Sequence, residues 1–257
     1  MRIIRYKTKD SDEVHVGWTD GEQAGPIMGD VFGMFRRLEA TLSMDDVRLL
    51  PPVHPGKIIC VGRNYAAHAE EHGAKVPEYP LLFLKPPSSI LGHGGIIRLP
   101  PQSAQVEHEG ELALVIGKRG RWIATENAYD HVFGYTVAND VTARDLQRKD
   151  NQWTRGKGYD TFCPFGPWVD TEFSPIDRLV TVHVNGEMRQ MASTRDMVYD
   201  IPRVISFASS FMTLEPGDLL LTGTPAGVGP LLDGDEVTVT VDGLGTLKNI
   251  VATEVRS

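Results

Sequence analysis

The stretch EHEGELALVIG, residues 107–117, carries three glutamates at every second position and ends in an apolar run. In an extended chain successive side chains alternate between two faces, so Glu107, Glu109 and Glu111 would share one face. Carboxylates at that spacing repel one another unless positive charge lies between them. The stretch therefore predicts a β-strand whose acidic face is either exposed to water or occupied by a cation.

Around this stretch the chain alternates short strand-like runs with few helical segments. KIICVG (57–62) is typical of a buried strand, and Asn185-Gly186 between β-compatible arms indicates a hairpin. The clearest helix is IPRVISFASSFM (201–212), whose apolar residues follow the helical period after Asp200, a good N-cap. Few helices and uneven connections predict an α+β, strand-rich fold and not a regular βαβ series.

A proline-rich segment, LLPPVHPGK (49–57), divides the chain into two parts. Its three prolines interrupt any regular element. Before it, short strand-like runs surround VFGMFRRLEATL (31–42), which predicts one helix. We therefore expect a small N-terminal α+β unit over residues 1–52 and a larger domain over residues 53–257.

Composition excludes several classes of protein. The 257 residues hold 26 Lys and Arg against 34 Asp and Glu, and no basic run alternates with aromatic residues, so nucleic acid is not an expected partner. The apolar runs are far shorter than the ~20 residues of a membrane helix, and the N-terminus lacks a signal peptide's apolar core. The two cysteines form no zinc-type cluster. These features predict a cytoplasmic protein without a membrane span.

A second acidic position follows the opening stretch. Asp140 interrupts an apolar β-type run in YTVANDVTARD (135–145), and an unpaired charge there would cost several kcal/mol. Together Glu109, Glu111 and Asp140 would form a site of three carboxylates, which suits Mg²⁺, Mn²⁺ or Ca²⁺ better than Zn²⁺. The alternative is that the glutamates lie on a solvated face and Asp140 pairs with Arg144.

A histidine and a glutamate form the next pair of interest. His68 and Glu71 are three residues apart in YAAHAEEHG (65–73), a helix-compatible segment, so they would lie on neighbouring parts of one face. A carboxylate bonded to an imidazole raises its basicity and suits a general base. The same spacing is also common on a solvated helix face.

Four further residues have side chains suited to holding a ligand. Arg144 and Gln147 are one helical turn apart after Asp140, and Lys157 stands between two glycines in TRGKGYD. Thr224 lies in GTPAGVG, which is not a nucleotide-binding P-loop because no Gly-Lys-Ser/Thr follows. The ordinary alternatives are surface charge, a cap or a turn.

Six motifs taken in order closely resemble the fumarylacetoacetate hydrolase family. They are GRNYAAHAEEHG (62–73), LLFLKPPSS (81–89), HEGELALVIGK (108–118), NDVTARDLQ (139–147), GKGYDTFCPFGP (156–167) and LEPGDLLLTGTPAGVG (214–229). The resemblance covers the chain from about residue 56 to its end, while residues 1–50 match no motif. It implies a rolled, mixed β structure flanked by helices, commonly a homodimer, and makes residues 53–257 the catalytic domain.

The resemblance also implies roles for the candidate residues. The E-x-E pair and the later aspartate would bind Mg²⁺ or Mn²⁺, with Ca²⁺ as a third cation that such ligands accept, and Glu107 falls outside this pattern. The implied roles are metal binding for Glu109, Glu111 and Asp140, catalysis for His68, Glu71 and Lys157, and contact with the substrate for Arg144, Gln147 and Thr224.

The implied activity is metal-dependent cleavage of a C–C bond in a 2-oxo acid. Acylpyruvate hydrolysis, with water activated by His68 and Glu71, and oxaloacetate decarboxylation both pass through an enolate that the cation stabilises. A further activity of the family, isomerisation of 2-hydroxyhepta-2,4-diene-1,7-dioate in aromatic catabolism, would use the same residues. A non-catalytic dicarboxylate-binding protein is the remaining alternative, and the presence of the base together with all three metal ligands disfavours it.

Overall fold

The computed structural model describes residues 1–71 and 73–255. The strands are β1 (Arg2–Thr8), β2 (His15–Thr19), β3 (Gln23–Gly29), β4 (Phe35–Arg37), β5 (Leu42–Ser43), β6 (Val47–Leu50), β7 (Ile58–Gly62), β8 (Leu81–Lys85), β9 (Ile90–Leu91), β10 (Ile96–Leu99), β11 (Val106–His108), β12 (Gly110–Ile116), β13 (Val132–Asn139), β14 (Thr142–Ala143), β15 (Cys163–Asp170), β16 (Leu179–Val184), β17 (Glu187–Ser193), β18 (Leu219–Leu221), β19 (Gly229–Pro230), β20 (Glu236–Val241) and β21 (Gly245–Thr253). The helices are α1 (Ala66–Glu71), α2 (Arg144–Lys149), α3 (Thr154–Lys157) and α4 (Ile201–Phe211), with 3₁₀ turns at η1 (Met44–Asp46), η2 (Pro87–Ser89), η3 (Thr125–His131) and η4 (Thr194–Asp196).

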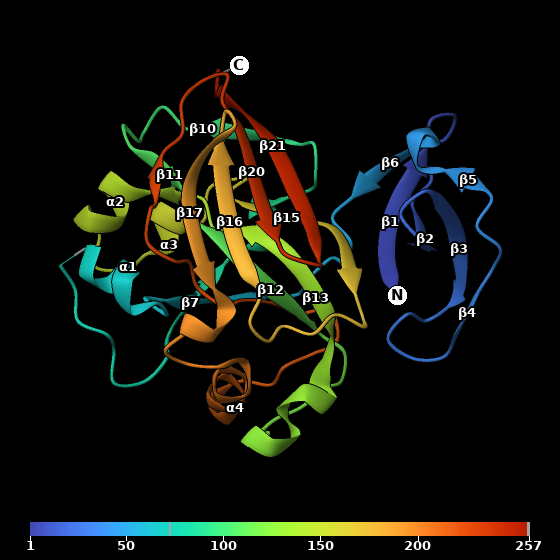
Figure 1. The fold of residues 1–257 in the computed structure, drawn as a ribbon, viewed down its shortest axis with the longest axis horizontal. Helices are drawn as coiled ribbons and strands as arrows, with labels where there is room; N and C mark the ends of the chain where they lie inside the picture. Colours follow the sequence, from blue (N-terminus) through green and yellow to red (C-terminus); the bar gives the residue numbers. More distant parts are fainter. Residues whose placement is uncertain (72, 256–257) are drawn as a thin grey trace.

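Three sheets make up most of the molecule, and the expected strand-rich, mixed β structure is confirmed (Figure 1). The largest runs β4-β3-β2-β1-β15-β13-β12-β18-β7-β8, a second runs β10-β21-β20-β16-β17, and a small third runs β14-β11-β19. Most neighbours are antiparallel, but β18 pairs with β7, and β10 with β21, in parallel. The few helices lie outside the sheets, with α1, α2 and α3 near one another and α4 beside η3 (Figure 1).

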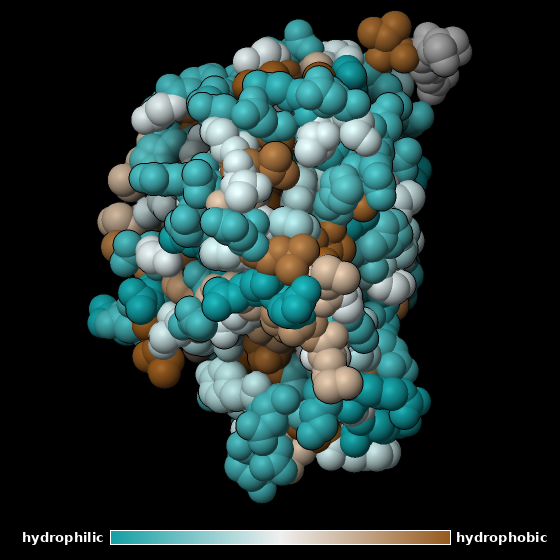
Figure 2. Space-filling view, turned by 90° about the vertical axis from the view of Figure 1, so that its right-hand side faces the viewer, coloured by the Kyte–Doolittle hydropathy of each residue, from teal (hydrophilic) through white to brown (hydrophobic). Residues whose placement is uncertain are grey.

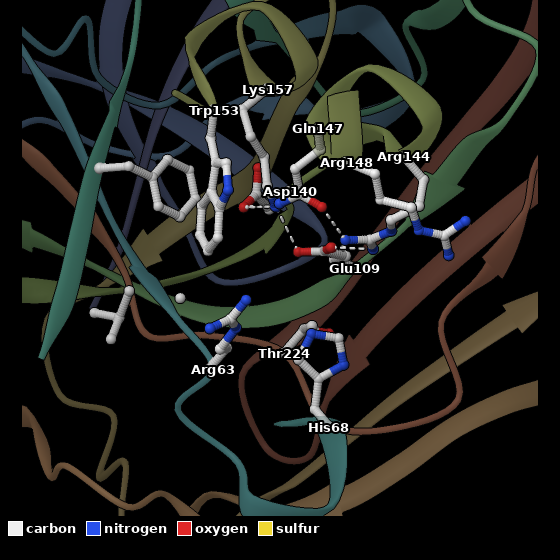
Figure 3. A pocket seen from close by; sticks show the side chains of 13 residues that line it. Arg63, His68, Glu109, Asp140, Arg144, Gln147, Arg148, Trp153, Lys157 and Thr224 are labelled. Atoms are coloured by element: carbon white, nitrogen blue, oxygen red, sulfur yellow. Dashed lines mark hydrogen bonds and ion pairs between the residues drawn. The ribbon is translucent and has the colours of Figure 1, made fainter. Parts of the chain in front are cut away.

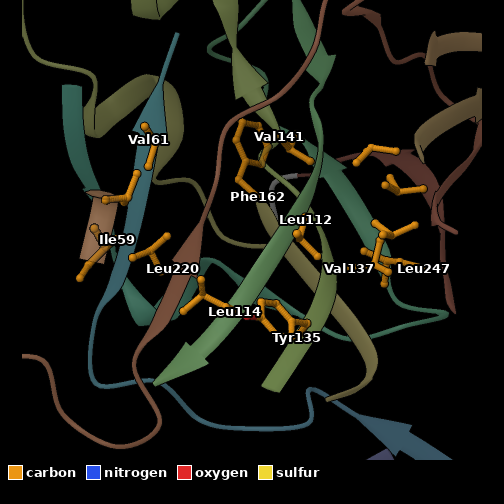
Figure 4. Close-up of a cluster of buried hydrophobic side chains, with 14 of the residues drawn as sticks. Ile59, Val61, Leu112, Leu114, Tyr135, Val137, Val141, Phe162, Leu220 and Leu247 are labelled. Carbon is orange, nitrogen blue, oxygen red and sulfur yellow. The ribbon is translucent and has the colours of Figure 1, made fainter. Parts of the chain in front are cut away.

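Strand β12 is buried on both faces, which explains the unbroken apolar run at its end. On one face Leu112 and Leu114 pack in the main core with Val137 of β13 and Leu247 of β21 (Figure 4). On the other face Ala113 belongs to a second core. Full burial of each leucine side chain contributes about 1.5–3 kcal/mol, so the strand is firmly anchored in the position from which it presents Glu111.

The N-terminal strands continue the largest sheet. Arg2 and Ile3 of β1 pair antiparallel with Asp170 and Val169 of β15. Ile3 is fully buried in the second core, together with residues from β7, β12 and β15. Seen from the side of this unit, the surface is mainly hydrophilic with scattered hydrophobic residues (Figure 2).

The helix predicted over residues 31–42 is wrong. Residues 35–37 form β4 and residues 42–43 form β5, both paired with β3. The Asp30 N–H donates to Met34 O at 3.1 Å, closing a turn that includes Gly33. Cross-strand pairing thus outweighs helix propensity here, and the described N-terminal residues hold strands and a 3₁₀ turn in place of the expected α-helix.

Other local predictions are confirmed. Helix α4 begins after Asp200, whose Oδ1 accepts the Arg203 N–H at 2.9 Å. Asn185 and Gly186 form the hairpin between β16 and β17, with φ of 53° and 80°. Among the described residues, none of the helices has the length and apolar character needed to cross a bilayer.

Candidate active site

Three carboxylates meet where β12 and β13 lie side by side. Glu111 belongs to β12, Glu109 lies in the one-residue break between β11 and β12, and Asp140 follows β13 directly. The Asp140 N–H donates to Glu109 O at 2.8 Å, and the Glu109 N–H donates to Asn139 Oδ1 at 2.9 Å. One oxygen from each of the three buried carboxylates lies within 4.8 Å of the others. The structure thus brings the predicted ligand set together.

Two lysines neutralise part of this negative charge. Lys157 Nζ lies 2.7 Å from Glu109 Oε2 and 2.6 Å from Asp140 Oδ2. Lys85 Nζ lies 2.5 Å from Asp140 Oδ1 and is fully buried. Sequence reasoning missed Lys85, although a charge at the end of the apolar run LLFLK is a signal of the same kind as Asp140 in its own run.

Arg144 pairs with the glutamates of the opening stretch. Its Nε lies 2.6 Å from Glu107 Oε2, and its Nη2 pairs with Glu109 Oε1. The alternative in which Asp140 pairs with Arg144 is therefore wrong, as is the alternative of a solvated glutamate face. Glu107, outside the family pattern, is buried and holds Arg144 in place.

Glu111 is the carboxylate that no cation neutralises. In the part of the chain described, it forms no ion pair; the Gly223 N–H donates to its Oε2 at 2.6 Å. Burial, and then the nearby Asp140 and Glu109, raise the pKa of Glu111 well above its usual range. Burial acts in the same direction on Glu109, but Lys157 and Arg144 more than offset it and lower the pKa of that carboxyl.

The local charge balance favours a bound cation. With Glu111 ionised, four buried carboxylates (Glu107, Glu109, Glu111, Asp140) face three buried cations (Lys85, Arg144, Lys157), which leaves one negative charge in excess. Oxygen ligands of this kind fit a hard divalent cation, which would supply the positive charge that Glu111 lacks.

Helix α1 places His68 next to Glu71. His68 Nδ1 lies 3.4 Å from Glu71 Oε2, and the histidine is buried at 6% exposure. Both carboxylate oxygens of Glu71 accept from the Gly227 N–H at 3.2 Å. Gly227 has a φ of 97°, and a Cβ there would lie 2.2 Å from Arg189 O, so this contact depends on glycine.

The predicted substrate-contacting residues lie beside the carboxylates. Gln147 lies one turn after Arg144 in α2, and its Oε1 accepts a hydrogen bond from Arg144 Nη1 at 2.6 Å. Thr224 Oγ1 donates to Gly110 O at 2.9 Å and accepts from Gln190 Nε2 at 2.9 Å. Both side chains are therefore held in fixed positions by the protein.

One cavity of about 270 Å³ connects these groups (Figure 3). Predicted residues that line it are His68, Glu109, Asp140, Arg144, Gln147, Lys157 and Thr224. It also has lining residues that sequence reasoning did not single out, namely Arg63, Phe83, Arg148 and Trp153. Phe83 and Trp153 pack edge to face, with their ring centroids 5.2 Å apart, and form an apolar wall of the cavity. A cavity with convergent charges and one apolar wall suits a small anionic ligand.

Comparison with known proteins agrees with the motifs. The family model described as fumarylacetoacetate (FAA) hydrolase C-terminal matches residues 57–252, and one described as Rv2993c-like, N-terminal matches residues 1–52. Protein Rv2993c of Mycobacterium tuberculosis is 51% identical over 98% of both chains. Oxaloacetate tautomerase YisK of Bacillus subtilis is 47% identical over 80% of this chain and 74% of its own. A crystal structure of 2-hydroxyhepta-2,4-diene-1,7-dioate isomerase from Mycobacterium marinum is 42% identical, with a TM-score of 0.91 and full coverage of both chains.

Proposed function

Since this chain belongs to the fumarylacetoacetate hydrolase family, we propose that it catalyses proton transfer next to the oxo group of a small 2-oxo acid, interconverting keto and enol forms of an oxaloacetate-like substrate. The observation that carries the proposal is one cavity that His68 lines together with Glu109 and Asp140 of the three-carboxylate site. The names of the related tautomerase and isomerase, which both denote proton shifts, support it.

The carboxylates and Lys157 would stabilise the negative charge that develops during this reaction. Glu109, Glu111 and Asp140 would hold Mg²⁺ or Mn²⁺, which supplies positive charge for an oxo oxygen as it becomes an enolate oxygen. Burial alone would lower the pKa of Lys157, but Asp140 and Glu109 raise it above its usual value. Lys157 therefore stays protonated and adds a fixed positive charge beside the substrate.

His68 would take the proton from the substrate carbon of the keto form and return one there from the enol form, while solvent water would exchange the proton on the enol oxygen. Glu71 Oε2 lies 3.4 Å from His68 Nδ1, so Nε2 is the nitrogen that would exchange a proton with the substrate carbon. The carboxylate, held in turn by the Gly227 N–H, stabilises the imidazolium that forms when His68 takes up the proton. The pair thus acts as one general base.

C–C bond cleavage is the second candidate. The same His68–Glu71 contact could activate water to attack an acylpyruvate, and the same positive charges would stabilise the enolate that hydrolysis or decarboxylation leaves. The two candidates differ in whether pyruvate is released.

One assay separates these candidates. The ultraviolet absorbance of enol oxaloacetate is followed together with pyruvate release by a coupled assay, using oxaloacetate and acetylpyruvate, with Mg²⁺, Mn²⁺ or chelator. Enzyme-free metal controls correct for spontaneous reaction. Faster, chelator-sensitive loss of the enol without pyruvate supports the tautomerase, and chelator-sensitive pyruvate supports cleavage. Failure to accelerate either reaction above the metal control would reject both.

Replacing Gly227 by alanine should slow the proton transfer about 10- to 100-fold, because the new Cβ meets Arg189 O and displaces the N–H that holds Glu71. The measurement is kcat for the keto–enol reaction. Gly186→Ala is the matched control, since Gly186 also has a positive φ of 80° but its Cβ would meet nothing within 4 Å. Equal kcat values for the two variants would show that the Glu71 contact does not matter.

A further inference from the structure

We propose that Arg63 binds the second carboxylate of the substrate, so that the site selects dicarboxylates over monocarboxylates of the same 2-oxo acid type. This inference rests on the proposed function and narrows its substrate class. It concerns a residue that the metal site and the His68–Glu71 pair do not involve.

Arg63 differs from the buried cations of the site in having its charge available. Lys85, Arg144 and Lys157 are each committed to buried carboxylates. Arg63 lines the same cavity and is only half-buried, and within residues 1–71 and 73–255 it forms no ion pair with Asp or Glu. Figure 3 shows its guanidinium directed into the cavity. A guanidinium in this position matches a carboxylate in shape and charge.

The protein holds Arg63 in an unusual backbone conformation. Its φ is 57°, a left-handed value that costs a non-glycine residue of order 1 kcal/mol and that occurs in tight turns and at functional sites. The next residue, Asn64, fixes this turn: its Nδ2 donates to Tyr199 O at 3.0 Å and Thr222 O at 2.7 Å, and its Oδ1 accepts the Tyr199 N–H at 2.8 Å.

An aromatic ring fixes the side chain as well. The Cζ of Arg63 lies 5.7 Å from the centre of the Trp153 ring, within cation–π range. Trp153 can approach because the residue before Arg63 is glycine: a Cβ at Gly62 would lie 2.6 Å from Trp153 Cζ3. A guanidinium that is already positioned loses less freedom on binding a carboxylate, which strengthens the interaction.

The place of Arg63 suits the far end of a substrate. Arg63 and His68 come from the same segment after β7 and lie on one side of the cavity, with Lys157, Gln147 and Arg144 on the other (Figure 3). The proposed function puts the 2-oxo acid end of the substrate at the carboxylate side and the reacting carbon at His68. A group attached to that carbon is then on the side of Arg63, as the second carboxylate of oxaloacetate would be.

The test compares two ligands that differ by one carboxylate. L-Malate and L-lactate share a 2-hydroxy acid end, and only malate has a second carboxylate. Isothermal titration in Mg²⁺ should show wild-type protein binding malate about 10- to 100-fold more tightly than lactate, the range for a hydrogen-bonded charge pair. Arg63→Met should remove this preference and leave lactate affinity unchanged.

Arg148 supplies the matched control. It also lines the cavity, but it lies on the exposed side of α2 and its Nη1 is 3.4 Å from Gln105 Oε1. Arg148→Met should keep the malate preference. If that variant loses the preference while Arg63→Met keeps it, or if wild-type protein binds the two ligands equally, the inference is overturned.

A second variant covers a loss of folding. If Arg63→Met melts well below wild type, Arg63→Lys is tested in its place. The ratio of malate to lactate affinity in Arg63→Lys should lie between the wild-type ratio and one, because the charge stays but the two-pronged contact is lost. An unchanged preference in Arg63→Lys would count against the inference. Binding is measured without turnover, so a malate preference that depends on Arg63 stands even where the assay of the proposed function shows no catalysis.

Discussion

Glu111→Gln should reduce cation-dependent turnover by about 100-fold or more, comparable to the loss of one group that stabilises developing charge. The same change should raise the melting temperature of the chelator-treated protein. Among the described residues Glu111 has no cationic partner, and its raised pKa means that keeping this carboxyl buried costs stability at neutral pH; the amide removes that cost, while its oxygen still accepts the Gly223 N–H. Turnover, Mg²⁺ titration and thermal melts in chelator measure the two effects.

Glu109→Gln is the matched comparison and should behave differently in the melt. Turnover should fall as far, but the metal-free protein should become less stable, because Arg144 and Lys157 each lose a buried carboxylate partner. Each kcal/mol lost corresponds to about 2–4 °C in a chain of this size. If both variants melt alike in chelator, or if Glu111→Gln keeps full Mg²⁺ affinity, the assigned cation site is wrong.

His68→Gln should have the second large effect, lowering kcat for keto–enol exchange by about 100- to 10,000-fold, the usual contribution of a positioned general base. Glutamine can occupy the buried space of the histidine but cannot take up a proton. Mg²⁺ affinity should stay near the wild-type value, because His68 belongs to α1 and not to the three-carboxylate site. Steady-state kinetics and Mg²⁺ titration on the same preparation test both statements.

The same variant also separates hydrolysis from decarboxylation, the two forms of the second candidate reaction. Hydrolysis of acetylpyruvate needs an activated water and should fall as steeply as the keto–enol exchange, whereas decarboxylation of oxaloacetate needs no base and should fall less. A His68→Gln protein that exchanges keto and enol forms at the wild-type rate would remove His68 from the mechanism. The half-buried His131, which does not line the cavity, supplies the control variant His131→Gln.

The acidic cluster could be predicted from sequence for a physical reason. Alternation in an extended chain has a fixed period of two, so Glu109 and Glu111 had to project together, and an aspartate in a buried run such as Asp140 had to find a partner. The partner itself could not be predicted. Pairing with Lys85 and Lys157 depends on where β8 and α3 meet β13, which is a property of the tertiary fold.

Arg63 and the helix expected at residues 31–42 show the limits of local patterns. An arginine after a glycine carries no periodic signal, and its left-handed backbone depends on hydrogen bonds from Asn64 to residues about 135 and 158 positions away. The segment at residues 31–42 has helical apolar spacing, but pairing with β3 determines its conformation. In the first case contacts distant in sequence, and in the second case pairing with the preceding strand, override the local preference.

Because β1 pairs with β15, residues from before and after the proline-rich segment belong to one sheet. Pairing of Arg2 with Asp170, and burial of Ile3 beside residues of β12 and β15, hold the first fifty residues by backbone and core contacts and not only by the covalent link. A chain cut within residues 51–55 would accordingly consist of two fragments with complementary edges, able to associate as an extra strand adds to a sheet. Without its first fragment, the second would carry a bare sheet edge next to an open apolar site, the combination that promotes self-association.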